Sequence, residues 1–147
     1  MPEMKGFDEI SAEDKERLTL TGINTENMEG RSGSFLLVND HVYHAGSAAE
    51  GIETLMIEQA LEKYEWLKDY FWNIVPADKD EYTKYVAERP QRGYVIIAHK
   101  GAKATFPLQS CMFLQGDTIQ AVHNIVIAEE GSEIHLIAGC ASSMDTK

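Results

Sequence analysis

Two segments of this chain repeat one another thirty positions apart. Residues 97–103 and residues 127–133 each begin in a β-branched run, continue with two charged or polar residues, and then place a glycine and a small residue before the next expected strand. Gly101 and Gly131 supply the positive φ that a tight turn between strands can require. Repeats of this length indicate stacked strands that bury a core only by covering one another. We therefore expect the two glycines to mark equivalent corners in successive layers.

The part of the chain before residue 91 predicts helices and one hairpin. A capping-box sequence predicts a short helix near 12–19. Apolar residues over 34–45, interrupted by two polar turn residues, predict a β-hairpin. Apolar spacing of three and four residues then predicts a helix over 57–71, and a second helix is expected over 78–88, closed by a proline.

After Gly93 the helical spacing ends and short β-branched or aromatic segments follow. Strands are expected over residues 94–98, 104–106, 125–128 and 134–137. The sequence therefore predicts a mostly β fold with an N-terminal helical part (α+β). It also predicts two regions, an acidic helical and hairpin region over 1–90 and a β core over 91–147.

The net charge of −11 is unevenly distributed and excludes some partners. Residues 1–90 hold 19 acidic and 9 basic residues, whereas residues 91–147 hold 5 acidic and 4 basic residues. An acidic surface is repelled by phosphate backbones and anionic lipid, so neither nucleic acid nor a membrane is expected as a partner. No apolar run reaches the roughly 18 residues that span a bilayer. Two cysteines are too few for a disulfide framework, which favours a reducing, cytoplasmic compartment.

The linear motifs of several enzyme classes are missing. The sequence contains no GxxxxGK[ST] phosphate loop and no GxGxxG, GxSxG, HExxH or CxxC pattern. We therefore expect a protein that is not an enzyme by itself. One alternative is a small metal-dependent β-barrel enzyme that uses His123, His135 and an acid. Both histidines lie in strand-like sequence, where a structural role is the simpler explanation, and the identity of any metal stays open.

The two cysteines differ in their surroundings. Cys140 follows Gly139 at the end of an apolar strand and precedes small polar residues, so its thiol is expected to be accessible. Cys111 lies in an apolar stretch and is expected to be packed. Because thiol chemistry depends on access and on a lowered pKa, Cys140 is the first candidate site residue, followed by Cys111, His123 and His135.

The residues after position 92 resemble the SufB/SufD family of iron–sulfur cluster assembly proteins. The matching residues are Gly93-Tyr94-Val95, Lys100-Gly101-Ala102-Lys103, Phe106-Pro107-Leu108-Gln109, Ile125-Val126-Ile127-Ala128-Glu129-Glu130-Gly131-Ser132 and Gly139-Cys140. Proteins of that family carry a lysine-glycine turn before a Pro-Leu-Gln strand, and then an acidic-glycine turn before a strand that ends in Gly-Cys. Order and spacing both agree, over about a third of the chain.

The resemblance implies a small helical domain followed by a right-handed parallel β-helix of stacked strands, whose first rungs lie over 91–147. It implies a scaffold subunit that associates with a SufC-like ATPase and a second SufB/SufD-like subunit, as a homo- or hetero-oligomer. Such a complex receives persulfide sulfur and iron and builds a transient iron–sulfur cluster, so no cofactor is expected on this stretch alone. Cys140, on the Gly-Cys position, is then the sulfur acceptor or a cluster contact.

Two departures from the family pattern leave a second interpretation open. Many SufB proteins have a Glu-Gly-Cys-Thr-Ala-Pro run where this chain has Ala-Gly-Cys-Ala-Ser-Ser over 138–143. The family's later rungs and ATPase-binding helices have no counterpart before Lys147, so a shortened or reduced member is expected. The alternative is a structural protein–protein interaction module without sulfur chemistry. In either case a sheet with an unpaired last strand is expected to associate with another chain.

Overall fold

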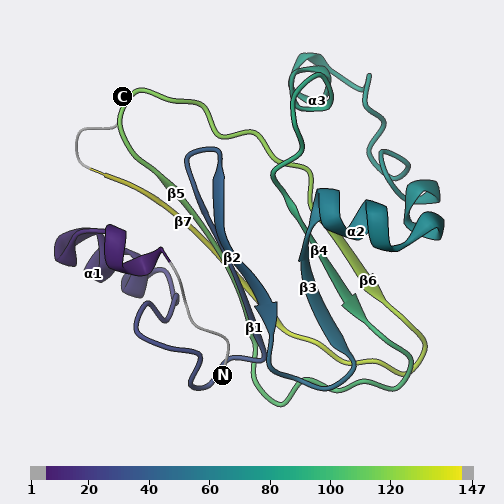
Figure 1. Ribbon diagram of the computed structural model, residues 1–147, viewed down its shortest axis with the longest axis horizontal. Helices are drawn as coiled ribbons and strands as arrows, with labels where there is room; N and C mark the ends of the chain where they lie inside the picture. Colours follow the sequence, from purple (N-terminus) through teal and green to yellow (C-terminus); the bar gives the residue numbers. More distant parts are fainter. Residues whose placement is uncertain (1–5, 144–147) are drawn as a thin grey trace.

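The computed structural model describes residues 6–143, which form two β-sheets, three α-helices and two short 3-10 helices (Figure 1). Helix α1 (Ala12–Leu20) packs on the outer face of one sheet, and helix α2 (Ile57–Lys63) packs on the outer face of the other. The chain is therefore α+β with mixed sheets, in agreement with the predicted class. Within residues 6–143 neither sheet closes into a barrel.

The first sheet has four strands in the order β2-β1-β5-β7. They are β1 (Gly33–Val38), β2 (His41–Ser47), β5 (Leu108–Leu114) and β7 (Leu136–Ser142). The predicted hairpin is confirmed, because β1 and β2 pair antiparallel and Asn39 in the turn has a φ of 55°. The β1–β5 and β5–β7 pairs are parallel.

The second sheet has three strands in the order β3-β4-β6. Strands β4 (Tyr94–Ala98) and β6 (Ile125–Ala128) confirm two predicted strands and pair in parallel. Strand β3 (Ile52–Met56) was not predicted, and it pairs antiparallel with β4. The regions 1–90 and 91–147 therefore share both sheets.

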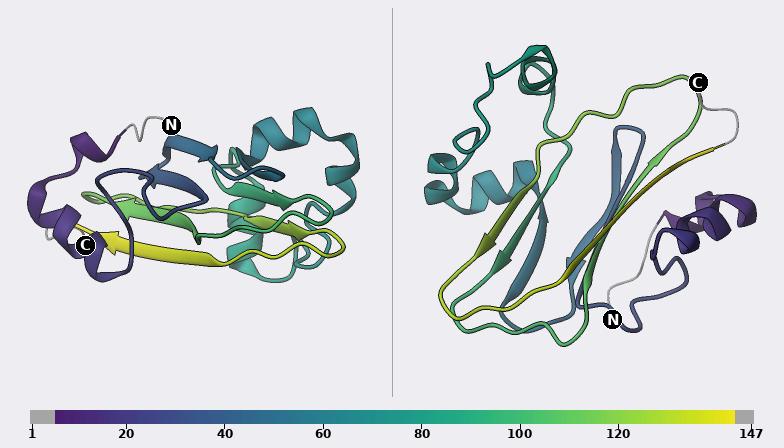
Figure 2. Two further views of the ribbon diagram at one scale, coloured as in Figure 1. Left: turned by 90° about the horizontal axis from the view of Figure 1, so that it is seen from below. Right: turned by 180° about the vertical axis from the view of Figure 1, so that it is seen from behind.

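From β4 onward the chain alternates between the two sheets and makes two successive passes. The left view of Figure 2 shows these passes as layers, with the colours running from blue through green to yellow across the stack. Ile97 on β4 pairs with Ile127 on β6, and Lys103 forms an isolated parallel bridge with Glu133. The two residues of each pair are thirty positions apart in the sequence. One period of the sequence repeat therefore corresponds to one pass of the chain.

The two glycine turns stack directly on one another. Gly101 and Gly131 have φ values of 74° and 72°, and the Gly101 amide donates to the Glu130 carbonyl at 3.0 Å. A Cβ on Gly131 would lie 3.9 Å from the Cα of Gly101. The prediction that these residues occupy equivalent corners of successive layers is confirmed.

Three apolar cores lie between the layers that the helices and the sheets form. The first lies between α1 and the four-stranded sheet and contains Leu18 and Phe113. The second lies between the two sheets and contains Phe35 and Leu108. The third lies between the three-stranded sheet and α2 and contains Ile57. Because all five side chains are 0 % exposed, each sheet buries apolar residues on both of its faces.

The predicted helix over 57–71 is wrong in its length. Helix α2 ends at Lys63, Tyr64 is extended with φ −122° and ψ 100°, and a 3-10 helix η2 (Glu65–Asp69) follows. The apolar spacing continues through the break, but the Tyr64 hydroxyl donates to Glu53 on β3 at 2.5 Å. A contact with the strand that precedes the helix therefore accompanies the end of this helix.

Of the other two α-helices, α1 confirms the helix predicted near 12–19, and α3 lies within the predicted range 78–88 but begins three residues later. The Ser11 side chain accepts a hydrogen bond from the Asp14 amide at 3.1 Å, which satisfies a free amide at the start of α1. Helix α3 (Glu81–Ala87) begins with a capping box formed by Asp80 and Thr83. A short 3-10 helix η1 (Phe7–Glu9) precedes α1. No helix within residues 6–143 has both the length and the apolar character needed to cross a bilayer.

Two predicted strands of the second half need correction. Residues 104–106 form no strand, and the strand of this pass is β5, which begins after Pro107. Proline has no amide hydrogen to donate to a ladder, so pairing starts at the next residue, where the Leu108 amide donates to the His135 carbonyl. The strand expected over 134–137 begins two residues later and extends to Ser142 as β7.

Candidate functional site

Cys140 lies within β7, which is an edge strand of the four-stranded sheet. It was expected at a strand end; instead it is the partner of Met112 in the middle of the β5–β7 ladder. Its exposure therefore comes from the open edge. The alternation of side chains places it on the same face as Leu136, toward the space between the sheets.

The Cys140 side chain borders a pocket of about 550 Å³. The other lining residues come from β5, from the following loop and from the end of β7, and they are Met112, Leu114, Thr118, Ile119, Gln120, Ala141 and Ser142. These side chains are either apolar or polar without charge, and none is acidic or basic. The pocket therefore gives a small molecule access to the thiol without a charged side chain in its lining.

The close packing around position 139 explains why a glycine precedes Cys140. A Cβ at position 139 would lie 2.6 Å from Thr21 Oγ1 and 2.8 Å from Ile23 Cγ1, both closer than side-chain carbons normally approach. The missing side chain lets the segment after α1 pack directly on β7. Because neighbouring residues of a strand face opposite sides, the same arrangement directs Cys140 away from α1.

Cys111 is packed, as expected. It is 0 % exposed within the core beneath α1, and its backbone pairs with Gly139 across the β5–β7 ladder. Burial, with a smaller contribution from the nearby Cys140, raises the pKa of the Cys111 thiol to about 12. Since the thiolate is the nucleophile, Cys111 is unreactive near neutral pH. The two free cysteines therefore differ in access and face opposite sides of the sheet.

His123 and His135 are not brought together by the fold. His123 stacks on Phe71 with a centroid distance of 5.2 Å and on Trp72 at 4.1 Å, and its Nδ1 has no partner in the described structure. Burial lowers the pKa of His123. His135 is exposed and lies beyond the opposite end of β6. Within residues 6–143 no three His, Cys, Asp or Glu side chains are grouped to hold a metal ion.

Gln109, the glutamine of the Pro-Leu-Gln sequence, clamps the segment after α1 onto the sheet. It is 1 % exposed, and the hydrogen bonds of its side chain go to this segment or to β1. Its Oε1 accepts from the Asn24 amide at 2.8 Å and from Arg31 Nε at 3.0 Å. Its Nε2 donates to the Asn24 carbonyl at 2.9 Å and to Ser34 Oγ at 3.1 Å. A buried amide with every group paired fixes the segment that packs against Gly139.

The two stacked turns carry opposite charges. Lys100 Nζ lies 3.4 Å from Glu130 Oε2, and Lys103 Nζ lies 3.5 Å from Glu133 Oε2. The Lys100 amide also donates to Glu129 Oε2 at 2.8 Å. The lysine-glycine turn and the acidic-glycine turn are therefore complementary partners across one layer spacing.

Comparison with known proteins bears on the family resemblance. No protein-family model matches the chain. An iron–sulfur cluster assembly SufBD family protein of Archaeoglobus fulgidus is 44 % identical over 142 residues, which cover 92 % of this chain and 38 % of that protein. The chain is a homologue of SufBD family proteins.

Further SufBD relatives show the same pattern of coverage. A SufBD family protein of Methanothermobacter thermautotrophicus is 43 % identical over 93 % of this chain and 34 % of its own length. One from Pyrococcus horikoshii is 28 % identical over 95 % of this chain and 32 % of its own length. The chain thus spans between 32 % and 38 % of the length of these relatives. The resemblance stated from the sequence motifs is confirmed.

Sequence reasoning missed a polar cluster that joins β3, α2 and the two stacked turns. Glu53 on β3 accepts hydrogen bonds from Lys63 Nζ and the Tyr64 hydroxyl, both at 2.5 Å, and shares one with His99 Nε2 at 2.6 Å. His99 Nδ1 in turn lies 3.6 Å from Glu129 Oε2. Partial burial acts to raise the pKa of Glu53, but the three hydrogen bonds outweigh it and lower the pKa to about 2. These residues share no spacing in the sequence that could have identified them.

Proposed function

We propose that this chain is part of a scaffold that assembles iron–sulfur clusters, with Cys140 as its sulfur acceptor, and that it is not an enzyme by itself. The observation that carries the proposal is the exposed thiol of Cys140 beside an uncharged pocket, on the Gly-Cys position of a SufBD homologue. Cys111 lies in the same sheet but is buried and has a raised pKa, so it is not a candidate sulfur acceptor.

The proposed reaction is the transfer of one sulfane sulfur. The Cys140 thiolate attacks the terminal sulfur of a donor persulfide, R–S–SH. A bond forms between Cys140 Sγ and that sulfur, the donor S–S bond breaks, and the donor leaves as the thiolate RS⁻. The oxidation level is conserved, so no external oxidant or reductant is needed. The side chains around the pocket carry no charge that could compete for a metal ion. The sulfur atoms therefore stay available for iron, which binds thiolate and sulfide ligands well.

The proposed scaffold continues the layered arrangement as a right-handed parallel β-helix. The thirty-residue spacing and the parallel β4–β6 and β5–β7 pairs support this proposal. In the whole protein we place a SufC-like ATPase and a second SufB/SufD-like subunit beside this chain, in the cytoplasm. A transient iron–sulfur cluster would be the product of the complex. It is cargo and not a resident cofactor of this stretch.

Incubation with a cysteine desulfurase and cysteine tests the sulfur transfer. After alkylation and proteolysis, mass spectrometry should find an added sulfur atom, about 32 Da, on the peptide that contains Cys140. A Cys111→Ser variant should accept sulfur as the parent chain does, whereas Cys140→Ser should accept none. Absence of sulfur on Cys140, or equal labelling of Cys111, would rule out the proposed acceptor.

A further inference from the structure

A thioether lies directly beside the Cys140 thiol. Met112 on β5 and Cys140 on β7 are partners in the parallel ladder that joins the two passes. Paired residues of a parallel ladder place their side chains on the same face of the sheet, and both side chains line the pocket of about 550 Å³. The cysteine is therefore not isolated, because a second sulfur atom is carried by the neighbouring strand at the same level.

The spacing of the two strands suits a metal ion held between two sulfur atoms. Such an ion needs the sulfur atoms about 4.6 Å apart, because each metal–sulfur bond is about 2.3 Å long. Neighbouring strands lie about 4.8 Å apart, so the side chains of a direct pair begin at a similar separation. Met112 is partly buried and Cys140 is exposed. Since methionine has three rotatable bonds, Met112 can adjust the position of its sulfur without a change of the backbone.

The number and charge of the ligands favour Cu(I) over a divalent ion. Thiolate and thioether are soft ligands, which Cu(I) prefers. Zn(II) also binds thiolate, but it takes four ligands in a tetrahedron. Within residues 6–143 no three His, Cys, Asp or Glu side chains are grouped, and the pocket lining has no acidic or basic side chain. One thiolate neutralises Cu(I), whereas a divalent ion would keep an unpaired charge beside apolar side chains.

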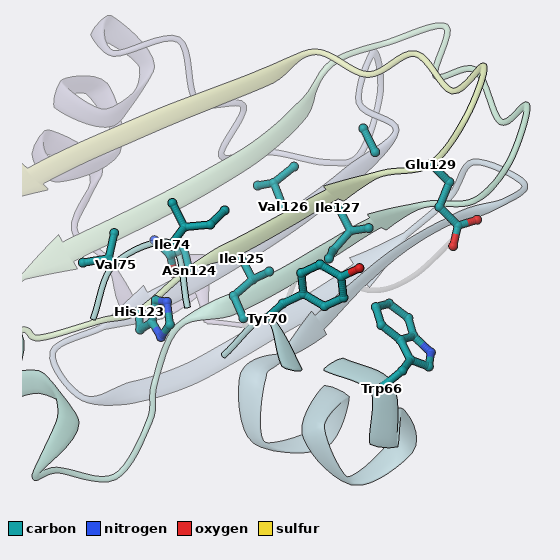
Figure 3. A pocket seen from close by; sticks show the side chains of 11 residues that line it. Trp66, Tyr70, Ile74, Val75, His123, Asn124, Ile125, Val126, Ile127 and Glu129 are labelled. Atoms are coloured by element: carbon teal, nitrogen blue, oxygen red, sulfur yellow. The ribbon is translucent and has the colours of Figure 1, made fainter. Parts of the chain in front are cut away.

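Two other places in the molecule lack this combination of access and soft ligands. Cys111 is 0 % exposed, and burial raises the pKa of its thiol to about 12, so it forms no thiolate near neutral pH. A pocket of about 800 Å³ lies beside β6, where Trp66 and Tyr70 project toward the strand (Figure 3). Among the described residues that line this second pocket, none is a cysteine or a methionine.

We propose that Met112 and Cys140 form a binding site for one Cu(I) ion, held between the Cys140 thiolate Sγ and the Met112 thioether Sδ. The ion replaces the thiol proton of Cys140, which passes to solvent, and neither copper nor sulfur changes its oxidation state. Both ligands lie on described strands, so the site does not use the outer edge of β7. A bound ion occupies the sulfur atom that the proposed sulfur transfer needs, and this consequence alone rests on the proposed function.

Anaerobic titration with Cu(I), in competition with the chromophoric chelator bathocuproine disulfonate, measures the affinity of the full chain. The parent chain should bind one Cu(I) ion, and Cys140→Ser should lose the site. Met112→Leu nearly conserves the side-chain volume and should bind Cu(I) at least about tenfold more weakly. Met56→Leu is the matched control, because Met56 is a partly buried strand methionine on the other sheet, and its affinity should equal that of the parent chain.

X-ray absorption at the copper edge identifies the ligands in the parent chain without any substitution. The spectrum should show two sulfur neighbours, and Met112→Leu should show one fewer. Zn(II) in about tenfold excess should leave Cu(I) in place, because the site lacks two of the four ligands that zinc takes. Fewer than two sulfur neighbours in the parent chain, equal affinities of Met112→Leu and the parent chain, or displacement by Zn(II) would each overturn the proposal.

Alkylation separates this proposal from the sulfur transfer. One equivalent of Cu(I) should protect Cys140 from iodoacetamide in the parent chain and in Met56→Leu, and protection should be weaker in Met112→Leu. A chain that accepts sulfur on Cys140 but binds no Cu(I) would overturn the metal site and leave the acceptor role in place. A chain that binds Cu(I) between the two sulfur atoms but accepts no sulfur would support the metal site and remove the acceptor role.

Discussion

Replacing Gln109 by Met removes four hydrogen bonds while nearly conserving side-chain volume. Two donors, the Asn24 amide and Arg31 Nε, lose their acceptor, and the Asn24 carbonyl and Ser34 Oγ lose their donor. Each unpaired group costs about 1 kcal/mol at a partly buried site, and the greater hydrophobicity of methionine returns about 1 kcal/mol. We therefore expect the free energy of unfolding to fall by about 3 kcal/mol.

Urea unfolding followed by circular dichroism measures this loss. With a slope of about 1.5 to 2 kcal/mol per molar urea, the midpoint should fall by about 1.5 to 2 M. Gln59→Met is the matched control, because Gln59 is exposed on α2, and its effect should stay within about 0.5 kcal/mol. A Gln109→Met midpoint equal to that of the control would refute the idea that this glutamine clamps the segment after α1.

Two other substitutions probe the packing and the charges around the layers. Gly139→Ala should lower the unfolding free energy by about 1 to 3 kcal/mol in the same urea assay, because its Cβ would lie 2.6 Å from Thr21 Oγ1; an unchanged midpoint would contradict the close approach of the two segments. Glu53→Gln removes a carboxylate whose folded pKa is lowered to about 2, so the parent chain's advantage should be full above about pH 5 and shrink as the pH falls toward 2. A stability difference that is equal at pH 7 and pH 3 would contradict the assigned role of Glu53.

The layered arrangement could be predicted because short stretches of neighbouring residues determine it. A strand, a glycine turn and a second strand recur at a fixed interval, and each copy carries its own turn residue, as Gly101 and Gly131 show. The N-terminal cap of α1 by Ser11 is likewise local and was recognised, whereas the capping box of α3 was not. Such features depend on a few neighbouring residues and can be recognised without knowledge of distant contacts.

The missed elements depend on contacts between residues far apart in the sequence. Strand β3 carries Glu53 and the buried Thr54, and β5 carries the buried Gln109, so neither shows a plain apolar strand pattern. These polar residues are buried because distant groups satisfy them, as Asn24 does for Gln109 at a separation of 85 residues. The end of α2 before Tyr64 is a different case, since the partner of the Tyr64 hydroxyl is Glu53 on β3, the strand that directly precedes the helix.

The expected accessibility of the Cys140 thiol is confirmed, but the sequence predicted it for a partly incorrect reason. The sequence distinguished Cys140 from Cys111 by placing Cys140 at a strand end. The structure instead places both in the β5–β7 ladder, where one faces a core and the other faces the space beside an open edge. Which strand lies at an edge follows from the pairing of the whole sheet, and single-sequence patterns do not give that pairing.

The stacking of the two passes is the claim on which the account of the fold and of the Cys140 site depends. Lys103→Cys/Glu133→Cys, in a Cys111→Ser/Cys140→Ser background, places two thiols on the parallel bridge that defines this stacking. Lys103→Cys/Glu130→Cys, which is three residues out of register, is the control. After mild oxidation of dilute protein, peptide mapping should find an intramolecular 103–133 disulfide that forms at least about tenfold faster than the control disulfide. Equal rates, or only links between molecules, would contradict a thirty-residue layer.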